Sequence, residues 1–175
     1  MPAPNRAKCN SPALFAGILC LLLLSVATTG QASIVQADKV VVVKGEQLLL
    51  LLRKGEILKS YRVALGRRPL GPKVRQGDGR TPEGTYFLDF RNDHSKYHRS
   101  IHISYPNELD IANARRHGVS PGSDIMIHGL PRGFEDLADV HTTRNWTKGC
   151  IAVSNAEIDE IWRLVPNGTP IEIRP

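Results

Sequence analysis

Cys150 and His128 are the side chains of this sequence whose chemistry best suits nucleophilic attack on a carbonyl. A thiol becomes a strong nucleophile when a neighbouring base removes its proton. An imidazole, with an ordinary pKa near ~6.5, can do so at neutral pH. His128 ends the apolar segment 124–128 and is followed by Gly129, which frees space beside the ring. We therefore expect Cys150 to be the nucleophile and His128 to be its base.

The backbone around Cys150 has features that acyl transfer needs. Gly149 allows a sharp turn directly before the sulfur and lets a substrate carbonyl come close. We expect the N–H groups of Gly149 and Cys150 to point at the oxygen on which negative charge develops. Losing one such donor typically lowers a rate by about 100- to 1000-fold.

The first 32 residues predict a secretory signal peptide. Arg6 and Lys8 precede the apolar run 13–27, and small and polar residues follow, so cleavage is expected after Ala27 or Ala32. The run is shorter than the ~20 residues of a spanning helix, although a retained anchor is the alternative. The protein is then expected outside the cytoplasm, in the periplasm or the cell-wall space.

Export makes the cysteine count informative. Cys9 and Cys20 leave with the signal peptide, so Cys150 alone remains. In an oxidising compartment a lone cysteine is buried and inert, paired between chains, or reactive.

The net charge of +6 falls to +4 without Arg6 and Lys8. A basic balance favours anionic partners, and export argues against nucleic acid.

The remaining chain reads as one mainly β domain with short helices, over residues 39–175. Strands are expected from β-branched, apolar or alternating runs at 40–43, 48–52, 57–65, 85–90, 100–104, 124–128 and 169–173. Helices are expected over 110–116, over 134–140 and after Ser154, where Glu157 completes a capping box. The class is α+β, with a single mixed or partly closed sheet.

The segment 66–84 is dense in glycine, proline and charge and lacks an apolar period. It is predicted to be a long structured loop, the kind of segment that often carries function on a β scaffold. We expect the cations of this loop to form a solvated basic surface. They are Arg67, Arg68, Lys73 and Arg80. The alternative is that these cations bind wall carboxylates.

Two separated motifs resemble the L,D-transpeptidase catalytic domain family (YkuD type). Ile127-His128-Gly129 is followed by Thr147-Lys148-Gly149-Cys150-Ile151, in the order of the family signature, and the segment 77–84 resembles its upstream loop. The similarity extends over roughly 39–175 and is strongest to the subgroup with Trp-Thr-x-Gly-Cys-Ile-Ala-Val. It implies an L,D-transpeptidase-like β-sandwich or partly closed barrel.

The resemblance also implies a reaction. Cys150 matches the residue that attacks the carbonyl of the third residue, a diamino acid, in a peptidoglycan tetrapeptide stem. D-Ala leaves, a thioester forms, and an amine of another stem resolves it into a 3-3 cross-link. His128 matches the base, and Gly149 and Thr147 match positions that shape the nucleophile turn and the oxyanion site. Gly129 and Lys148 are also expected to be substrate-binding residues.

Departures from the family pattern leave the acceptor open. Lys148 stands where many members have histidine, and Ala152 where many have arginine or asparagine. Cross-linking, attachment of a protein to the wall, and hydrolysis as an L,D-endopeptidase or carboxypeptidase are the candidates. The partners expected are stem peptides and a wall-attached protein, and the chain is expected to act as a monomer.

Two further function classes compete with a cysteine acyltransferase. In a wall-binding module without catalysis, Cys150 would be a buried thiol and the basic loop would hold the polymer. In a metallohydrolase, histidines would bind zinc, and His94, His98, His102, His117 and His141 remain besides His128. Because no His-Glu-x-x-His motif occurs, we expect neither a metal nor a cofactor.

Overall fold

The structure is a computed structural model that describes residues 1–2 and 35–175. Apart from Met1 and Pro2, the expected signal peptide over 1–32, with both cleavage positions, lies outside the described residues. Among the residues that are described, no helix is long and apolar enough to cross a membrane.

The domain opens with a three-stranded antiparallel meander. Lys44 to Gln47 and Lys54-Gly55 form the tight turns between its strands. Leu49 and Leu51 are fully buried, because alternate side chains of a strand face the same side. The strands are β1 (Lys39–Val43), β2 (Leu48–Arg53) and β3 (Glu56–Arg62).

The long loop predicted over 66–84 separates this meander from the second group of strands. The remaining strands are β4 (Gly84–Ser95), β5 (His98–Ile103), β6 (Met126–His128), β7 (Ile151–Ala152) and β8 (Thr169–Arg174). All described strands join one eight-stranded mixed sheet, in the order β3-β2-β1-β8-β4-β5-β6-β7. The predicted class, mainly β with short helices, is confirmed.

The two ends of this sheet meet, which makes it a partly closed barrel. The segment after β3 reaches β7, where Ala64 and Ala152 exchange backbone hydrogen bonds of 2.9 and 2.8 Å. One step further, Thr147 N–H donates to Leu65 O and Arg67 N–H donates to Thr147 O, both at 3.1 Å. We call this junction the seam. It joins the beginning of the loop 66–84 to the segment that carries Cys150.

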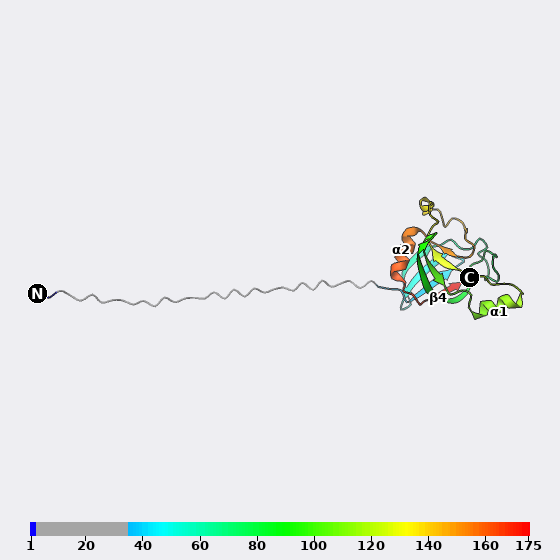
Figure 1. Cartoon of the computed structure of the whole chain (residues 1–175), viewed down its shortest axis with the longest axis horizontal. Coiled ribbons are helices and arrows are strands. Elements are labelled where there is room, and N and C mark those ends of the chain that lie inside the picture. The colour runs from blue at the N-terminus through cyan, green and yellow to red at the C-terminus, as the bar shows by residue number, and fades with distance from the viewer. Residues whose placement is uncertain (3–34) are drawn as a thin grey trace. The chain divides into compact units, whose positions relative to one another are not determined.

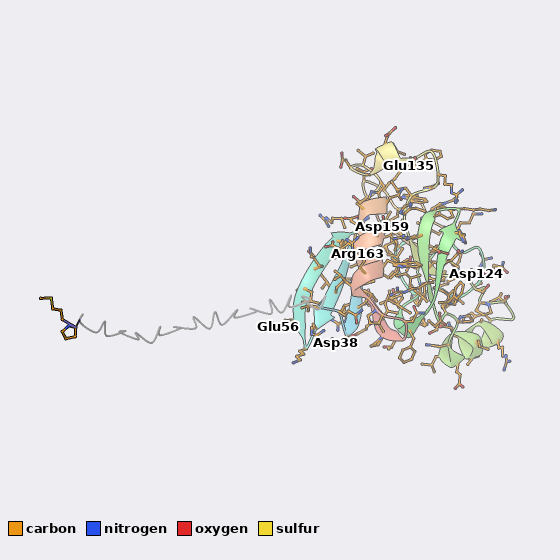
Figure 2. The ribbon with its side chains drawn as sticks, turned by 60° about the vertical axis from the view of Figure 1, so that its left-hand side comes forward. Asp38, Glu56, Asp124, Glu135, Asp159 and Arg163 are labelled. Carbon is orange, nitrogen blue, oxygen red and sulfur yellow. The ribbon has the colours of Figure 1, made fainter. Side chains whose placement is uncertain are left out.

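Two helices accompany the sheet on different sides of it (Figure 1). Helix α2 (Asn155–Leu164) begins at Ser154, whose capping box with Glu157 is formed as predicted. It packs against β5 and β6 through the buried Ile158 and Ile161. Asp159 and Arg163 project from it, whereas Asp124 lies beyond β4 and β5 in the view of Figure 2.

Helix α1 (Glu108–Arg116) begins two residues earlier than predicted, because Asn107 caps it and Asp110 completes a second capping box. The helix expected over 134–140 is reduced to one 3-10 turn, η1 (Glu135–Leu137), followed by turns. No side-chain cap holds its start, and none of its residues is buried, so nothing stabilises a longer helix there.

Candidate active site

Strand pairing brings Cys150 and His128 to the same cavity. Strands β6 and β7 are parallel, with Ile127 opposite Ile151 and His128 opposite Ala152. Cys150 directly precedes β7 and is therefore level with Met126, one side-chain repeat before His128 on the same face. Both residues line a cavity of about 680 Å³. Thr147 and Lys148 also line it, whereas Gly129 and Gly149 do not.

His128 is held with one ring nitrogen occupied. Its Nδ1 lies 2.7 Å from Gly129 O, and because a carbonyl only accepts, Nδ1 carries the proton of the neutral ring. Nε2 is then the basic nitrogen. Burial lowers the pKa of His128, and the Gly129 carbonyl opposes this by stabilising the protonated ring. The imidazole is therefore neutral at neutral pH, as a general base must be.

Two aromatic rings fix the plane of the imidazole. The Tyr97 ring lies over His128 at 4.5 Å between centroids, and the Trp146 ring meets it edge-on at 5.9 Å. Both rings therefore pack against the candidate base. Limited freedom of the ring favours proton transfer along one direction.

The Cys150 thiol lies at the entrance to β6. Its Sγ–H points to Asp124 O at 3.5 Å. Burial raises the pKa of the Cys150 thiol, and the Asp124 charge adds to this, whereas the Met126 N–H and the Lys73 ammonium lower it. In the described chain no hydrogen bond joins Sγ to His128. The free protein thus holds a neutral thiol beside a neutral imidazole.

Thr147 braces the turn before the cysteine. It is buried, its hydroxyl donates to Cys150 O at 2.7 Å, and it accepts from Gly149 N–H at 3.1 Å. In this conformation the Gly149 N–H, which was expected to serve the oxyanion, donates to the Thr147 hydroxyl. Within the described residues Cys150 N–H has no such competitor and stays available.

The two glycines are required by close contacts. Gly149 has φ +137°, and a Cβ there would lie 2.6 Å from Arg80 O. At Gly129 a Cβ would lie 2.6 Å from Asn155 Oδ1, which accepts from Leu130 N–H at 2.8 Å. The space that Gly129 was expected to leave beside the imidazole thus admits the first residue of α2. Larger residues would push either β6 or the nucleophile turn out of place.

Several polar residues of the cavity were not expected to belong to the site, among them Ser100, Asp124 and Lys73. Ser100 lies opposite His128 in the β5–β6 pairing, is 1% exposed, and its Oγ has no partner in the described structure. Asp124 has φ 60°, in the left-handed region that aspartate adopts more readily than most residues, and its carbonyl faces the thiol. Lys73, expected on a solvated surface, is only 4% exposed, because it pairs with Asp78.

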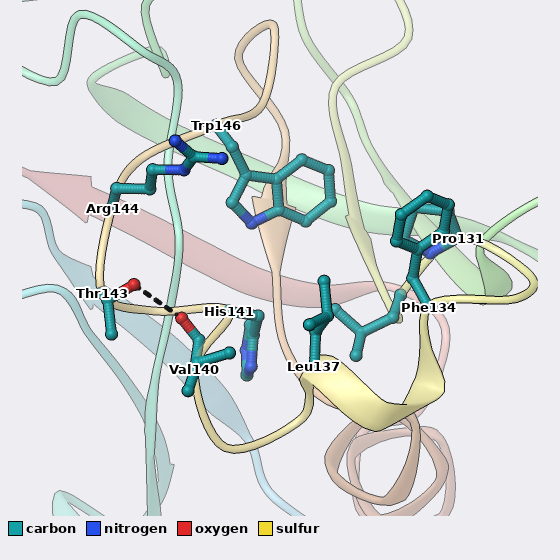
Figure 3. Close-up of a pocket in the computed structure, with 9 residues that line it drawn as sticks. Pro131, Phe134, Leu137, Val140, His141, Thr143, Arg144 and Trp146 are labelled. Carbon is teal, nitrogen blue, oxygen red and sulfur yellow. Dashed lines mark hydrogen bonds between the residues drawn. The ribbon is translucent and has the colours of Figure 1, made fainter.

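A second hollow, drawn in Figure 3, shares Trp146 with the cavity. Its volume is about 510 Å³, and Leu137 and Val140 contribute to its apolar lining. His141 is one of its polar members, with Thr143 and Arg144. Its Nδ1 lies 2.6 Å from Ala138 O, and its Nε2 has no partner among the described residues. Trp146 is thus a wall shared by an apolar hollow and the candidate reaction cavity.

The other histidines do not assemble a metal site. His98 Nε2 lies 2.9 Å from Asp159, and His102 Nδ1 lies 2.7 Å from Asp89, on separate parts of the sheet. In the part of the chain that the structure describes, no group of three His, Cys, Asp or Glu residues could hold a metal ion.

Residues 37–173 match the L,D-transpeptidase catalytic domain (YkuD), which is most of the chain. The chain belongs to the L,D-transpeptidase catalytic domain family. Its similarity to the Escherichia coli (strain K12) protein YafK, an L,D-transpeptidase by name, is 37% identity over 122 residues. That match covers 66% of this chain and 42% of YafK.

Two solved structures have a fold similar to that of this chain. The helical cell shape determining protein Pgp2 from Campylobacter jejuni matches with a TM-score of 0.59 and 25% identity, over 77% of this chain and 46% of Pgp2. Bdellovibrio bacteriovorus Bd1075 matches with a TM-score of 0.54 and 27% identity, over 79% of this chain and 48% of its own. This L,D-transpeptidase-family chain therefore spans less than half of these relatives.

Proposed function

We propose that the protein is a cysteine-dependent peptidoglycan L,D-transpeptidase, with Cys150 as nucleophile and His128 as base. The observation that carries the proposal is their placement on one face of the β6–β7 pair, with Nδ1 of His128 tied to Gly129 O. This tie leaves Nε2 as the only imidazole nitrogen that can take the thiol proton.

In the first half-reaction the thiol proton moves to Nε2 while Sγ attacks the carbonyl of the diamino acid in a tetrapeptide stem. A tetrahedral oxyanion forms, and Cys150 N–H is the backbone donor available to it. The carbonyl then re-forms, its bond to the D-Ala nitrogen breaks, and Nε2 returns the proton to that nitrogen. D-Ala leaves, and a thioester remains on Cys150.

In the second half-reaction an amine of another stem gives a proton to Nε2 and attacks the thioester. The sulfur leaves and recovers the proton, and a 3-3 cross-link results. An amine of a wall-attached protein would give attachment by the same steps, and water would give hydrolysis. The partners proposed are therefore peptidoglycan stems, with the acceptor to be identified from the products.

The test is incubation of purified protein with defined tetrapeptide muropeptides, followed by mass analysis of products. We expect release of D-Ala and cross-linked dimers, and a hydrolase would give tripeptide monomers alone. Cys150→Ala should fold normally and release no D-Ala, and continued release by that variant would overturn the mechanism. His128→Gln should lose most of the rate, and an unchanged rate would remove His128 from the role.

Export is proposed on the sequence of residues 1–32. In a bacterial host, the full chain with a C-terminal tag should be recovered from the periplasm, shortened after Ala27 or Ala32, as intact mass would show. Recovery of an uncleaved chain from the membrane fraction would favour a retained anchor instead.

A further inference from the structure

Lys73 is a cation held at the wall of the reaction cavity rather than in solvent. Its side chain is 3% exposed, yet it is among the residues that line the cavity with Cys150. An ammonium loses much hydration on such burial, so it needs compensating contacts. These come from the loop 66–84, the segment that also meets the nucleophile turn at the seam.

The hydrogen bonds of Lys73 use two of the three N–H donors of its ammonium group. Its Nζ donates to Asp78 Oδ1 at 2.9 Å and to Arg75 O at 3.1 Å. An ammonium has three N–H bonds, and in the described structure no third acceptor is assigned to this one. Since the residue lines the cavity, a ligand there can supply the missing acceptor.

Asp78 neutralises Lys73 but is itself saturated. Its carboxylate also accepts from the N–H groups of Val74, Arg75 and Arg80, at 2.9 to 3.1 Å. Burial alone would raise the pKa of Asp78, but these N–H groups and the Lys73 ammonium together lower it. The carboxylate therefore stays ionised and keeps Lys73 in one position.

The charge of the cavity is suited to an anion. Arg67 and Lys148 line it together with Lys73, and among its described lining residues Asp124 is the one carboxylate. That carboxylate is exposed and accepts from Ser123 Oγ at 2.7 Å. Lys73 also lowers the pKa of the Cys150 thiol through its charge, which places it within electrostatic reach of the sulfur.

We propose that Lys73, held by Asp78, binds the terminal carboxylate of the stem peptide, on the residue that leaves when Cys150 attacks. The proposal rests on the proposed function and adds a selection rule. Stems that end at the leaving residue are accepted, and stems that continue beyond it, or end in an amide, are bound poorly. A charge-assisted hydrogen bond from a fixed ammonium is the physical basis of this preference.

The experiment measures binding without turnover. Calorimetry on the Cys150→Ala protein compares two tetrapeptides that differ only at the C-terminus, a free carboxylate and a carboxamide. We expect the carboxylate to bind about 10- to 100-fold more tightly. In Cys150→Ala/Lys73→Met the ratio should fall close to one, and Cys150→Ala/Lys73→Arg should keep part of it.

Two controls separate recognition from folding. Lys59→Met removes an exposed lysine that is also ion-paired, with Glu160 at 2.8 Å, and should leave the ratio unchanged. Lys73→Met/Asp78→Asn removes both buried charges, so no unpaired carboxylate remains, and it should still lose the preference. A ratio that survives in a folded Lys73→Met protein would overturn the proposal.

The outcome also separates this inference from the proposed function. If the protein binds neither tetrapeptide and releases no D-Ala, the proposed function fails. If it releases D-Ala from the free tetrapeptide and D-alaninamide from the carboxamide equally well, the function stands and Lys73 has no part in recognition.

Discussion

The ionisation states of Cys150 and His128 decide how the rate should vary with pH. Burial moves the two pKa values in opposite directions, lowering that of His128 and raising that of Cys150. Protonation of His128 abolishes the base, but only below the ~6.5 of a free imidazole. We therefore expect kcat/KM to hold constant through neutral pH and to fall only when the pH drops below that value.

Alkylation of Cys150 checks the same assignment. Because the pKa of the thiol is raised, its reaction with iodoacetamide should be slow at pH 7 and accelerate above the ordinary ionisation range of a thiol. Mass spectrometry of the modified protein follows the rate. Rapid alkylation at pH 7 would instead show a thiolate–imidazolium pair in the free protein.

Thr147 links the two peptide groups around Cys150 through one hydroxyl. Thr147→Val keeps the shape but leaves Gly149 N–H without its acceptor and Cys150 O without its donor. We expect a loss of about 1–3 kcal/mol in the free energy of unfolding, and a lower kcat because the turn loosens. Denaturant unfolding and D-Ala release measure the two effects.

Thr147→Ser and Thr143→Val are the controls for that prediction. Serine keeps the hydroxyl and should retain most of the stability and rate. Thr143 is exposed, with its hydroxyl donating only to Val140 O, so its replacement should change stability by less than about 0.5 kcal/mol. Equal losses at both threonines would contradict the bracing role of Thr147.

At the scale of the element, Asp78 is the centre on which the loop 66–84 is organised. Its pKa is lowered in the folded protein, so its ionised form contributes stability above the ordinary carboxyl pKa. That contribution is lost as the pH falls through the lower, folded value. Asp78→Asn should cost about 1–3 kcal/mol at neutral pH and should reduce the loss of stability below pH ~4.

Urea unfolding at pH 7 and at pH 3 measures the difference for Asp78→Asn. Asp93→Asn is the matched control, because the Asp93 side chain is 66% exposed and its only ion pair, among the described residues, is to the exposed His94 at 3.8 Å. Its effect should stay within about 0.5 kcal/mol. An unaltered pH dependence in Asp78→Asn would show that the loop does not depend on the charge.

The sequence predicted those elements whose cause is local. The strand runs, the capping box of α2 and the long loop each follow from neighbouring residues, and the structure confirms them. The 3-10 turn at Glu135–Leu137 replaced a predicted helix, because the segment lacks a buried face. The motifs also placed His128 and Cys150 in the site, although their roles are proposals.

What the sequence could not predict depends on pairing between distant segments. The burial of Lys73 follows from the loop wrapping around Asp78, and the spacing of these two residues alone does not distinguish that from a solvated loop. Ser100 enters the cavity because β5 pairs with β6 in one register, and a shift by one residue would turn it away. The position of Ser100 thus required the register of the sheet, and the burial of Lys73 required the fold of the loop.

At the scale of the whole molecule, the seam couples closure of the barrel to the site. Ala64 and Ala152 are fully buried where the segment after β3 meets β7. Ala152 follows Cys150 by two residues and lies opposite His128. Both positions carry small side chains, and the interior around them is closely packed. Opening the seam would therefore release the nucleophile turn together with one edge of the sheet.

Ala152→Val tests that coupling by adding two methyl groups at the seam. Overpacking should lower the free energy of unfolding by about 1–3 kcal/mol, and the displaced turn should slow D-Ala release. Ala112→Val, at an exposed position of α1, should lower the free energy of unfolding only by the small loss in helix propensity. It should leave the rate of D-Ala release unchanged. If Ala152→Val lowers stability but leaves the rate unchanged, the seam supports the barrel without positioning Cys150, because a shifted β7 would necessarily move the sulfur away from His128.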